Sequence, residues 1–403
     1  MTATATGLTL DQLLQRVDDF LAEHDPASLT TDEERMAWLR ARYDAGLAWV
    51  HFPEGRGGLG LPRSWQVEVD AKLTAAGAPD NRSRTNTIGL GMAAPTILGF
   101  GTPEQLDRFL RPLWTGEEIW CQLFSEPGAG SDLAAAATRA VKDGDEWVVN
   151  GQKVWTSGAH NADWAILVAR TDPDVPKHRG LSYFLCNMHD PGVDVRPLRQ
   201  ITGEAEFNEV FLTDVRIPDA HRLGEVGEGW KIATFTLNNE RVAIGGGSNP
   251  REGALIGTVA KTWREHPERR TPDLHQRLLK LWVDAEVMRI SGQRLRQKLA
   301  AGQPGPEGSA MKLSFARINQ ELSGLELEIL GEDGLRYGDW TMRRPGIGAM
   351  MGRDAGFRYL RLKGNSIEGG TSEILRNVVA ERILGLPGEH RVDKDVPWKD
   401  IPR

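Results

Sequence analysis

The spacing of apolar residues changes twice along the chain, and this change constrains the fold more than any other feature of the sequence. Up to about residue 118 the apolar residues recur with the 3.6-residue period of helices, and from about 119 to 225 they form short runs between turn residues, as strands do. The helical period then returns in long segments, at about 228–262, 272–300, 307–331 and 371–385. We therefore predict an α+β fold with an N-terminal helical domain (1–118), a central β-barrel or sandwich domain (119–226), a C-terminal helical bundle (227–390) and a tail (391–403).

Three capping motifs mark the starts of helices in the N-terminal part. They begin at Thr9, Thr31 and Thr102, and each hydroxyl is followed three residues later by Glu or Gln. This spacing lets the two side chains satisfy free backbone N–H groups of a first helical turn. The third motif also has proline at the first helical position, where no N–H donor is lost.

One strong turn signal lies in the strand region. In EWVVNGQKVW (146–155), Asn150-Gly151 separates two short apolar runs, and this dipeptide is the one that two-residue hairpins prefer. We therefore expect a hairpin with its turn at these two residues. Further strands are expected in WAILVAR, LSYFLCNM, VDVRPL and NEVFLTDVRIP.

The composition is that of a soluble protein with a large core. Of 403 residues, 40% are hydrophobic and 26% are charged, which suits two or three domains. The net charge is −7 and no segment concentrates basic residues, so we expect no nucleic-acid partner. Cys121 and Cys186 stand far apart and the histidines lack paired spacing, so we expect neither disulfides nor a metal site, and a reducing cytoplasmic location fits best. Without a run of ~20 apolar residues, a membrane span is not expected.

Two motifs in the central part are candidates for ligand contacts. CQLFSEPGAGSD (121–132) is a turn of small residues whose hydroxyls, at Ser125 and Ser131, and backbone N–H groups suit the polar edge of a cofactor. It lacks both the Lys-Ser/Thr pair of a P-loop and the GxGxxG spacing. KVWTSG (153–158) places an indole beside two hydroxyls at a strand end, which a packed tryptophan next to a turn explains equally well.

SIEGGTSEILR (366–376) combines a carboxylate, two glycines and a helix start. Thr371 or Ser372 can cap the first turn, and Glu373 suits the positive end of the helix dipole. The two glycines allow the backbone to approach a ligand closely. Whether Glu368, just before them, is a catalytic base cannot be decided from this stretch alone.

Seven stretches resemble the acyl-CoA dehydrogenase family, in the family's order and over nearly the whole chain: FPEGRGGLGLP, FSEPGAGSDL, NGQKVWTSG, FNEVFLTDVRIP, GEVGEGW, NNERVAIGG and GGTSEILRNVVAERILGLP. The resemblance implies an N-terminal helical domain, a central β-domain and a C-terminal four-helix bundle. It implies FAD between the last two, usually against a neighbouring subunit of a tetramer or dimer. It also implies the oxidation of an acyl-CoA thioester to the trans-2-enoyl-CoA, with the electrons passing to an electron-transferring flavoprotein.

The resemblance also assigns roles to residues at matching positions. Contacts with FAD are expected at Leu123, Phe124, Ser125, Trp155, Ser157, Thr371 and Glu373. Among these, Ser125 would lie near the polar edge of the flavin ring, Trp155 beside the ring and Ser157 near its N5 atom. Contacts with the substrate are expected at Ser131, Arg241 and Gly370, although Arg241 is better explained as a brace for its own helix.

The reaction needs a carboxylate to remove the α-proton, and the family offers two positions for it. Many members carry a glutamate where this chain has Gly369, and Glu368 stands one residue too early. Members resembling the isovaleryl- and long-chain-type enzymes carry it on a bundle helix directly before an arginine, as in Glu240-Arg241. We therefore expect Glu240 to be the base and the backbone of Gly369 to bind the thioester oxygen. The competing interpretations are a surface Glu240 paired with Arg241 or Lys231, and Glu368 as the base.

Two other functions stay open at this point. With oxygen as electron acceptor the protein would be an acyl-CoA oxidase, and without catalysis it would be a subunit of a heteromeric dehydrogenase. The second alternative rests on the missing glutamate at 369 and on HPERRTPDLHQ and LGEDG, which depart from the family's pattern at the adenine end of the FAD site. Glycines 245–247 remove side-chain volume after the proposed base, which favours a bulky, branched or long acyl group unless they only end the helix.

Overall fold

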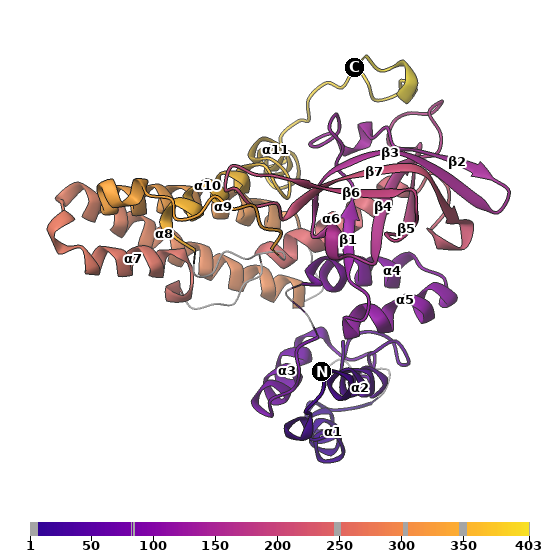
Figure 1. The fold of residues 1–403 in the computed structure, drawn as a ribbon, viewed down its shortest axis with the longest axis horizontal. Coiled ribbons are helices and arrows are strands. Elements are labelled where there is room, and N and C mark those ends of the chain that lie inside the picture. The colour runs from indigo at the N-terminus through magenta and orange to yellow at the C-terminus, as the bar shows by residue number, and fades with distance from the viewer. Residues whose placement is uncertain are drawn as a thin grey trace.

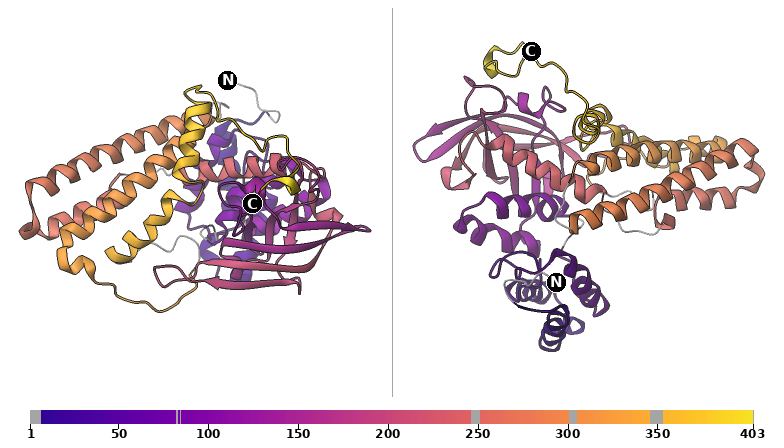
Figure 2. Two further views of the ribbon diagram at one scale, coloured as in Figure 1. Left: turned by 90° about the horizontal axis from the view of Figure 1, so that it is seen from above. Right: turned by 180° about the vertical axis from the view of Figure 1, so that it is seen from behind.

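The computed structural model describes residues 7–81, 83, 85–245, 251–300, 305–345 and 353–402, with the backbone alone at 240–245 and 299–300. A group of N-terminal helices lies beside a sheet domain, and the long helices of the C-terminal part project away from both (Figure 1). The two further views show the same projection (Figure 2). The predicted α+β architecture of helices, sheet domain and helical bundle is confirmed. Within the described ranges no helix is both long and apolar enough to cross a membrane.

Capped helices form the N-terminal part. They are α1 (Leu10–Glu23), α2 (Asp32–Asp44), α3 (Gln66–Ala75), α4 (Ala94–Phe100), which a π-helical turn at Gly89–Ala93 precedes, and α5 (Pro103–Thr115). The capping motifs predicted at Thr9, Thr31 and Thr102 are confirmed, because each hydroxyl accepts the N–H three residues on and the side chain there bonds back. These bonds satisfy donors that a helix start would otherwise leave unpaired.

The described part of the central domain contains eight strands in one sheet. They are β1 (Trp120–Leu123), β2 (Arg139–Asp143), β3 (Glu146–Ser157), β4 (Trp164–Arg170), β5 (Leu181–Asn187), β6 (Val193–Leu198), β7 (Phe207–Pro218) and β8 (Arg222–Leu223). Their order is β6-β7-β3-β2-β4-β5-β8, and β1 pairs in parallel with β4. The four strands predicted from WAILVAR to NEVFLTDVRIP are confirmed as β4 to β7.

Strand β4 separates two hydrophobic cores. All seven of its residues are buried. Trp164, Ile166 and Val168 belong to the core shared with the N-terminal helices, whereas the residues between them belong to the core of the sheet domain. Alternate residues of a strand point to opposite faces, so burial on both faces explains why this segment lacks an alternation of polar and apolar residues.

The hairpin predicted at Asn150-Gly151 is wrong. Strand β3 runs through both residues, and the turn that joins it to β2 lies at Gly144, where φ is 64°. Asn150 and Gly151 stand instead at an irregularity in the pairing of β3 with β7. The Asn150 amide donates to Asp214 at 2.9 Å, and a Cβ at Gly151 would lie 2.4 Å from Thr138 Oγ1. The glycine therefore permits a close approach between strands rather than a turn.

The C-terminal part consists of α6 (Gly229–Gly245), α7 (Leu255–Glu265), α8 (Pro272–Ala300), α9 (Glu307–Leu330), α10 (Ala355–Leu362) and α11 (Ser372–Arg382). The single helical segment expected at 228–262 is divided between α6 and α7. Helices α7, α8 and α9 share a core that includes Val259, Leu281 and Leu325. Helix α6 lies between this bundle and the sheet domain, because it contacts α9 on one side and β5 on the other.

A buried chain of hydroxyls fixes α6 to the other two parts. Tyr183 Oη of β5 lies 3.0 Å from Thr236 Oγ1 of α6, which lies 2.9 Å from Thr96 Oγ1 of α4. All three side chains are fully buried, and burial raises the pKa of Tyr183. Because a buried hydroxyl without a partner is costly, this chain holds α6 in one rotational setting.

Candidate active site

A buried ion pair holds the turn that follows β1. Lys153 of β3 is fully buried, and its Nζ lies 2.8 Å from Glu126 Oε1 and donates to the carbonyls of Phe124 (3.0 Å) and Val168 (2.8 Å). Three partners satisfy the three donors of the ammonium group. Burial lowers the pKa of Lys153, and the charge of Glu126 opposes this shift. The pair ties the FSEPGAGSD turn to the strand that carries Trp155.

Glu126 is a structural carboxylate. It also accepts the backbone N–H groups of Ala137 at 2.6 Å and Thr138 at 2.9 Å. Burial alone would raise the pKa of Glu126, but the charge of Lys153 and these donors outweigh burial and lower it. Neither Glu126 nor Lys153 was singled out from the sequence. A lysine at an inward position of an alternating strand, as in QKVW, is the signal that indicates such a partner.

The residues predicted on this turn differ in what they can offer a ligand. Leu123 and Phe124 are buried, and the Phe124 ring packs edge-on against Tyr183 with 5.8 Å between centroids. Ser125 is half-buried, and its carbonyl accepts the N–H of the strand residue next to Lys153 at 2.9 Å. Ser131 is exposed. The side chains of the first two therefore belong to the core, and the two serines present polar groups at the surface.

Trp155 presents a large apolar face at the surface in a strained conformation. Its φ is 60° and its side chain is 58% exposed, with the Phe207 ring edge-on at 5.8 Å. A non-glycine residue in the left-handed region costs about 1–3 kcal/mol and is typical of functional sites. Beside it, the buried Thr156 Oγ1 has no hydrogen-bond partner among the described residues, and Ser157 is half-buried. A flat face next to an unsatisfied hydroxyl fits a flat heterocycle with a polar edge, as a flavin is.

The loop that contains Gly369 and Gly370, here called the glycine loop, lies before α11 and is fixed by α9. Gly369 and Gly370 have φ values of 64° and 94°, which glycine adopts without strain. Lys312 of α9 is buried and donates to the carbonyls of Asn365 and Gly370, both at 2.7 Å. The loop backbone is therefore held in one conformation by the bundle.

The helix start predicted after these glycines is confirmed. Thr371 Oγ1 accepts the N–H of Ile374 at 3.2 Å and caps α11. Glu373 is exposed in the first turn and pairs with Arg376 at 3.1 Å. Contacts of Thr371 and Glu373 with a cofactor stay a prediction.

Glu368 is engaged within the protein. Arg361 of α10 binds both of its carboxylate oxygens, at 3.0 and 3.2 Å, and the Asn365 amide donates to it at 2.5 Å. The same guanidinium donates to Glu206 of the sheet domain at 2.7 Å. A parallel ion pair joins Glu204 to Arg353. Glu368 thus helps to fasten the glycine loop to the sheet domain.

The proposed base and its neighbour lie on α6, and the side chains of Glu240 and Arg241 fall outside the described residues. The backbone nevertheless defines their position on the helix. Ile232, Ala233 and Thr236 of α6 are fully buried. Position 240 follows Thr236 by four residues, so the helical period places it on this same face.

A pocket of about 470 Å³ opens where α6 begins and α11 ends. It is lined by Pro176, His178, Arg179, Trp230, Arg382, Arg391, Lys394 and Asp395. Four of these eight side chains are Arg or Lys and one is acidic, so the pocket favours an anion. Burial, aided by the charges of Arg391 and Lys177, lowers the pKa of His178, whose ring packs edge-on against Trp230 with 4.8 Å between centroids. The sequence did not reveal this pocket, because four separate segments contribute to it.

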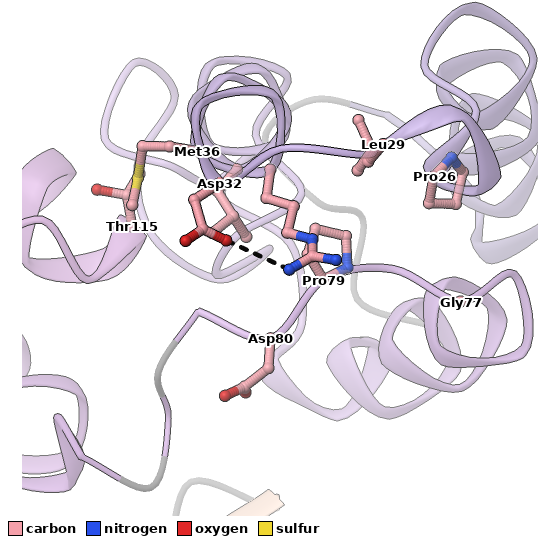
Figure 3. Close-up of a pocket in the computed structure, with 10 residues that line it drawn as sticks. Pro26, Leu29, Asp32, Met36, Gly77, Pro79, Asp80 and Thr115 are labelled. Carbon is pink, nitrogen blue, oxygen red and sulfur yellow. Dashed lines mark hydrogen bonds and ion pairs between the residues drawn. The ribbon is translucent and has the colours of Figure 1, made fainter.

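A second cavity, of about 500 Å³, lies among the N-terminal helices (Figure 3). Its wall includes Asp32 and Arg35 of α2, which pair at 3.3 Å, and Gly77, Pro79 and Asp80 beyond α3. Since none of the residues predicted for the active site lines it, this cavity is separate from that site.

The described ranges contain neither a grouped set of metal ligands nor a reactive thiol. There, no three His, Cys, Asp or Glu side chains are grouped to hold a metal ion. Cys121 and Cys186 are free and buried, and burial raises the pKa of both thiols, that of Cys186 to about 12. Both cysteines therefore stay protonated at neutral pH.

Comparisons with known proteins agree with this arrangement. Three family models match in order: the N-terminal domain of acyl-CoA dehydrogenase over residues 9–117, the middle domain over 121–215 and the C-terminal domain over 227–384. The chain is 39% identical over 362 residues to the acyl-CoA dehydrogenase IpdE1 of Mycobacterium tuberculosis, and this match covers 89% of each chain.

Two solved structures are similar over almost the whole chain. They are the Tcur3481-Tcur3483 steroid ACAD (28% identity, TM-score 0.69) and the ChsE4-ChsE5 complex from Mycobacterium tuberculosis (27% identity, TM-score 0.67), and each match covers 94% of this chain and 98% of the other. The three matched domains and the aligned relative confirm the resemblance seen in the sequence. The chain therefore belongs to the acyl-CoA dehydrogenase family, whose members are oxidoreductases that in general depend on FAD.

Proposed function

We propose that the chain is an FAD-dependent acyl-CoA dehydrogenase in which Glu240 removes the α-proton of an acyl-CoA thioester to give the trans-2-enoyl-CoA. The observation that carries this assignment is the binding of Glu368 by Arg361 and Asn365. A carboxylate that is held by a bidentate arginine and an amide must give up these bonds before it can accept a proton from a substrate, which is costly. Position 240 continues the buried face of α6, so it is the better candidate.

Gly369 is proposed to bind the thioester oxygen through its backbone N–H. Hydrogen bonds to that oxygen acidify the α-proton, and they are most effective when the donor is already in place. Lys312 and Arg361 hold the glycine loop on two sides, which supports such preorganisation. Dividing the two tasks leaves the carboxylate of Glu240 free to face the α-carbon from α6.

Trp155, Ser157 and Ser125 are proposed to hold the flavin ring, with Thr371 and Glu373 on the bundle side. When bound, FAD accepts the hydride from the β-carbon of the substrate. The exposed indole face of Trp155 and the hydroxyl of Ser157 support this placement. The buried side chains of Leu123 and Phe124 would leave their backbone to contact the cofactor, since both pack into the core.

The basic pocket supports a CoA thioester as the substrate. CoA carries a diphosphate and a 3′-phosphate, and arginine and lysine bind phosphate through charge-assisted hydrogen bonds. The pocket adjoins the proposed substrate side of the site, because Lys177, next to His178, pairs with Asp132 at 2.6 Å, one residue after Ser131. Trp230 adds an aromatic wall on which an adenine ring could pack.

A bulky acyl group is the proposed substrate class. A solved structure that is 28% identical to this chain carries the name steroid ACAD, which supports an acyl group with fused rings. The glycine run that begins at Gly245 lies one to two turns beyond position 240, and glycine leaves space for such a group. Residues 246–250 lie outside the described residues.

An apolar stripe on α8 supports assembly with further subunits. Leu279, Val283, Val287 and Ile290 follow one another at helical spacing and are 52–59% exposed. Such a contiguous stripe is typical of a helix that another chain covers. We propose that a second chain of the same fold covers it, in a tetramer or dimer, and the names of both solved structures, which pair two proteins, support an unlike partner.

Flavin spectroscopy tests this proposal directly. The purified holoenzyme, alone and with its partner, is titrated without oxygen with CoA thioesters whose acyl groups are short, long, branched or fused-ring. Bleaching of the flavin, an enoyl product and no peroxide after oxygen is admitted are expected, with an electron-transferring flavoprotein as the acceptor. Stoichiometric peroxide would indicate an oxidase, and a protein that never takes up FAD would be a non-catalytic subunit.

A further inference from the structure

The C-terminal tail, residues 388–402, turns back from α11 onto the sheet domain (Figure 1). The backbone N–H groups of Trp398 and Lys399 donate to the carbonyls of Val175 at 2.9 Å and Pro173 at 3.1 Å. The Lys399 ammonium group pairs with Asp174 at 2.6 Å. The tail thus adds main-chain and charged contacts to the loop between β4 and β5.

Trp398 anchors the tail on the segment that follows the FSEPGAGSD turn. Its indole N–H donates to the carbonyl of Ala135 at 3.1 Å, and the Arg170 guanidinium stacks on its ring at 4.6 Å. Arg170 is buried and donates to the carbonyls of Ala134 at 2.5 Å and Lys177 at 2.7 Å. One arginine therefore connects the tail, the turn and the β4–β5 loop.

A second anchor lies at Asp393. The buried ammonium group of Lys177 binds Asp393 of the tail and also Asp132 at the end of the turn. The hydrogen bond from Lys177 lowers the pKa of Asp393 to about 2. Asp393 is therefore ionised at neutral pH, where it accepts this contact from Lys177.

The attached tail supplies one wall of the basic pocket. Arg391 and Lys394 of the tail provide two of its four cations, and Arg179 and Arg382 provide the other two. The match to the family's C-terminal domain ends at residue 384, so the two tail cations lie beyond it. A pocket that gathers four cations from separate segments is suited to a ligand with several phosphate groups.

We propose that the tail is a fixed part of the substrate site, in which Arg391 and Lys394, together with Arg179 and Arg382, bind the phosphate groups of the acyl-CoA nucleotide while Trp398 holds the tail in place. This inference rests on the proposed function, because it takes a CoA thioester as the substrate. It predicts that the tail strengthens the binding of the nucleotide part of the CoA thioester and does not change the rate of proton removal.

Kinetics of the holoenzyme with two thioesters of one acyl group test the inference. One is the CoA thioester and the other is the N-acetylcysteamine thioester, which lacks the nucleotide. In the variant with Arg391→Ala and Lys394→Ala, KM for the CoA thioester should rise about tenfold or more at unchanged kcat, because uniform binding is lost. Kinetic constants for the N-acetylcysteamine thioester should not change. Trp398→Ala should produce the same selective rise although it keeps both cations.

Two controls distinguish a failure of the inference about the tail from a failure of the proposed function. Lys261→Ala removes an exposed cation of α7 and should leave both KM values unchanged. The Kd of adenosine 3′,5′-bisphosphate, measured by calorimetry, should rise about tenfold in the tail variants. The binding of this nucleotide does not depend on turnover. If no CoA thioester bleaches the wild-type flavin, the proposed function fails while the calorimetry still tests the tail. KM and Kd values within about twofold of wild type in all tail variants would overturn the inference.

Discussion

Arg361 and Glu368 form a bidentate ion pair, with guanidinium nitrogens 3.0 and 3.2 Å from the two carboxylate oxygens. The arginine is only 16% exposed and also binds Glu206 of the sheet domain. One guanidinium therefore fastens the glycine loop of the bundle to the sheet domain. The pair gives Glu368 a structural role, and it directs the search for the catalytic base to α6.

The burial of Glu206 predicts an unusual pH dependence, although Arg361 opposes the effect of burial. Burial raises the pKa of this carboxyl above its ordinary value of 4.5, so its contribution to stability is present below about pH 4.5 and is lost as the pH rises through the folded-state pKa. Glutamine stays neutral. The difference in the free energy of unfolding between Glu206→Gln and wild type should therefore move in favour of the variant as the pH rises from about 4.5 to about 8.

Urea unfolding at several pH values measures this difference. Glu328→Gln is the matched control: the hydrogen bond from Arg277 lowers the pKa of Glu328, so the contribution of this carboxylate is lost only below about pH 4.5, and its difference from wild type should stay nearly constant over the same range. A difference for Glu206→Gln that stays constant over the pH range would contradict the prediction.

The buried pair of Lys153 and Glu126 predicts strong coupling. Lys153→Met should destabilise the protein by about 3–5 kcal/mol, because it leaves the Glu126 charge buried without its cation. It should also weaken the retention of FAD, since the turn loses the side-chain bonds that it receives from Lys153 of β3. Adding Glu126→Gln should recover part of the lost stability. Denaturant unfolding and the flavin content of the purified variants measure both effects, and a double variant no more stable than Lys153→Met would count against the pair.

The conformation of Gly369 predicts that even a methyl group impairs catalysis. With φ at 64°, Gly369→Ala introduces strain of about 1 kcal/mol and displaces the N–H that is proposed to bind the thioester oxygen. We expect kcat to fall about 100-fold, as small displacements of positioned groups commonly cause. Gly385→Ala is the control, because φ is 69° there and a Cβ would meet nothing within 4 Å. It should show a similar loss of stability with unchanged kcat; equal kcat in both variants would argue against a role for Gly369.

The apolar stripe of α8 predicts that charge disrupts assembly. Val283→Lys together with Val287→Lys would place two charges in an interface, which costs several kcal/mol per buried ion. Light scattering after gel filtration should show a smaller particle than wild type. Leu335→Lys changes an exposed leucine outside the stripe and should leave the mass unchanged. An intact assembly in the double variant would mean that α8 faces solvent.

Local patterns predicted the fold well where the physics is local. The capping motifs at Thr9, Thr31 and Thr102 and the cap at Thr371 involve residues three positions apart, so the sequence alone contains both partners. The hairpin at Gly151 failed for the opposite reason. That glycine is required by the close approach of Thr138, just before β2, and a single segment does not show what lies across the sheet.

The site was predictable only in part, because its supports join distant segments. Lys153 and Glu126 are 27 residues apart, and Arg361 meets Glu206 across 155 residues. The basic pocket draws Arg179, Arg382 and Arg391 from three segments that only the fold brings together. The resemblance to a family supplied positions for the flavin contacts and the base, but it gave no information on the tail beyond residue 387.

The assignment of the base is the central claim, and rapid-reaction kinetics test it most directly. The rate of flavin reduction by a reactive acyl-CoA is measured in Glu240→Gln and in Glu368→Gln at equal flavin content. Removing the base should slow reduction by at least about 100-fold in Glu240→Gln, whereas Glu368→Gln should lose stability and retain most of the rate. Fast reduction in Glu240→Gln together with abolished reduction in a folded Glu368→Gln would contradict the account.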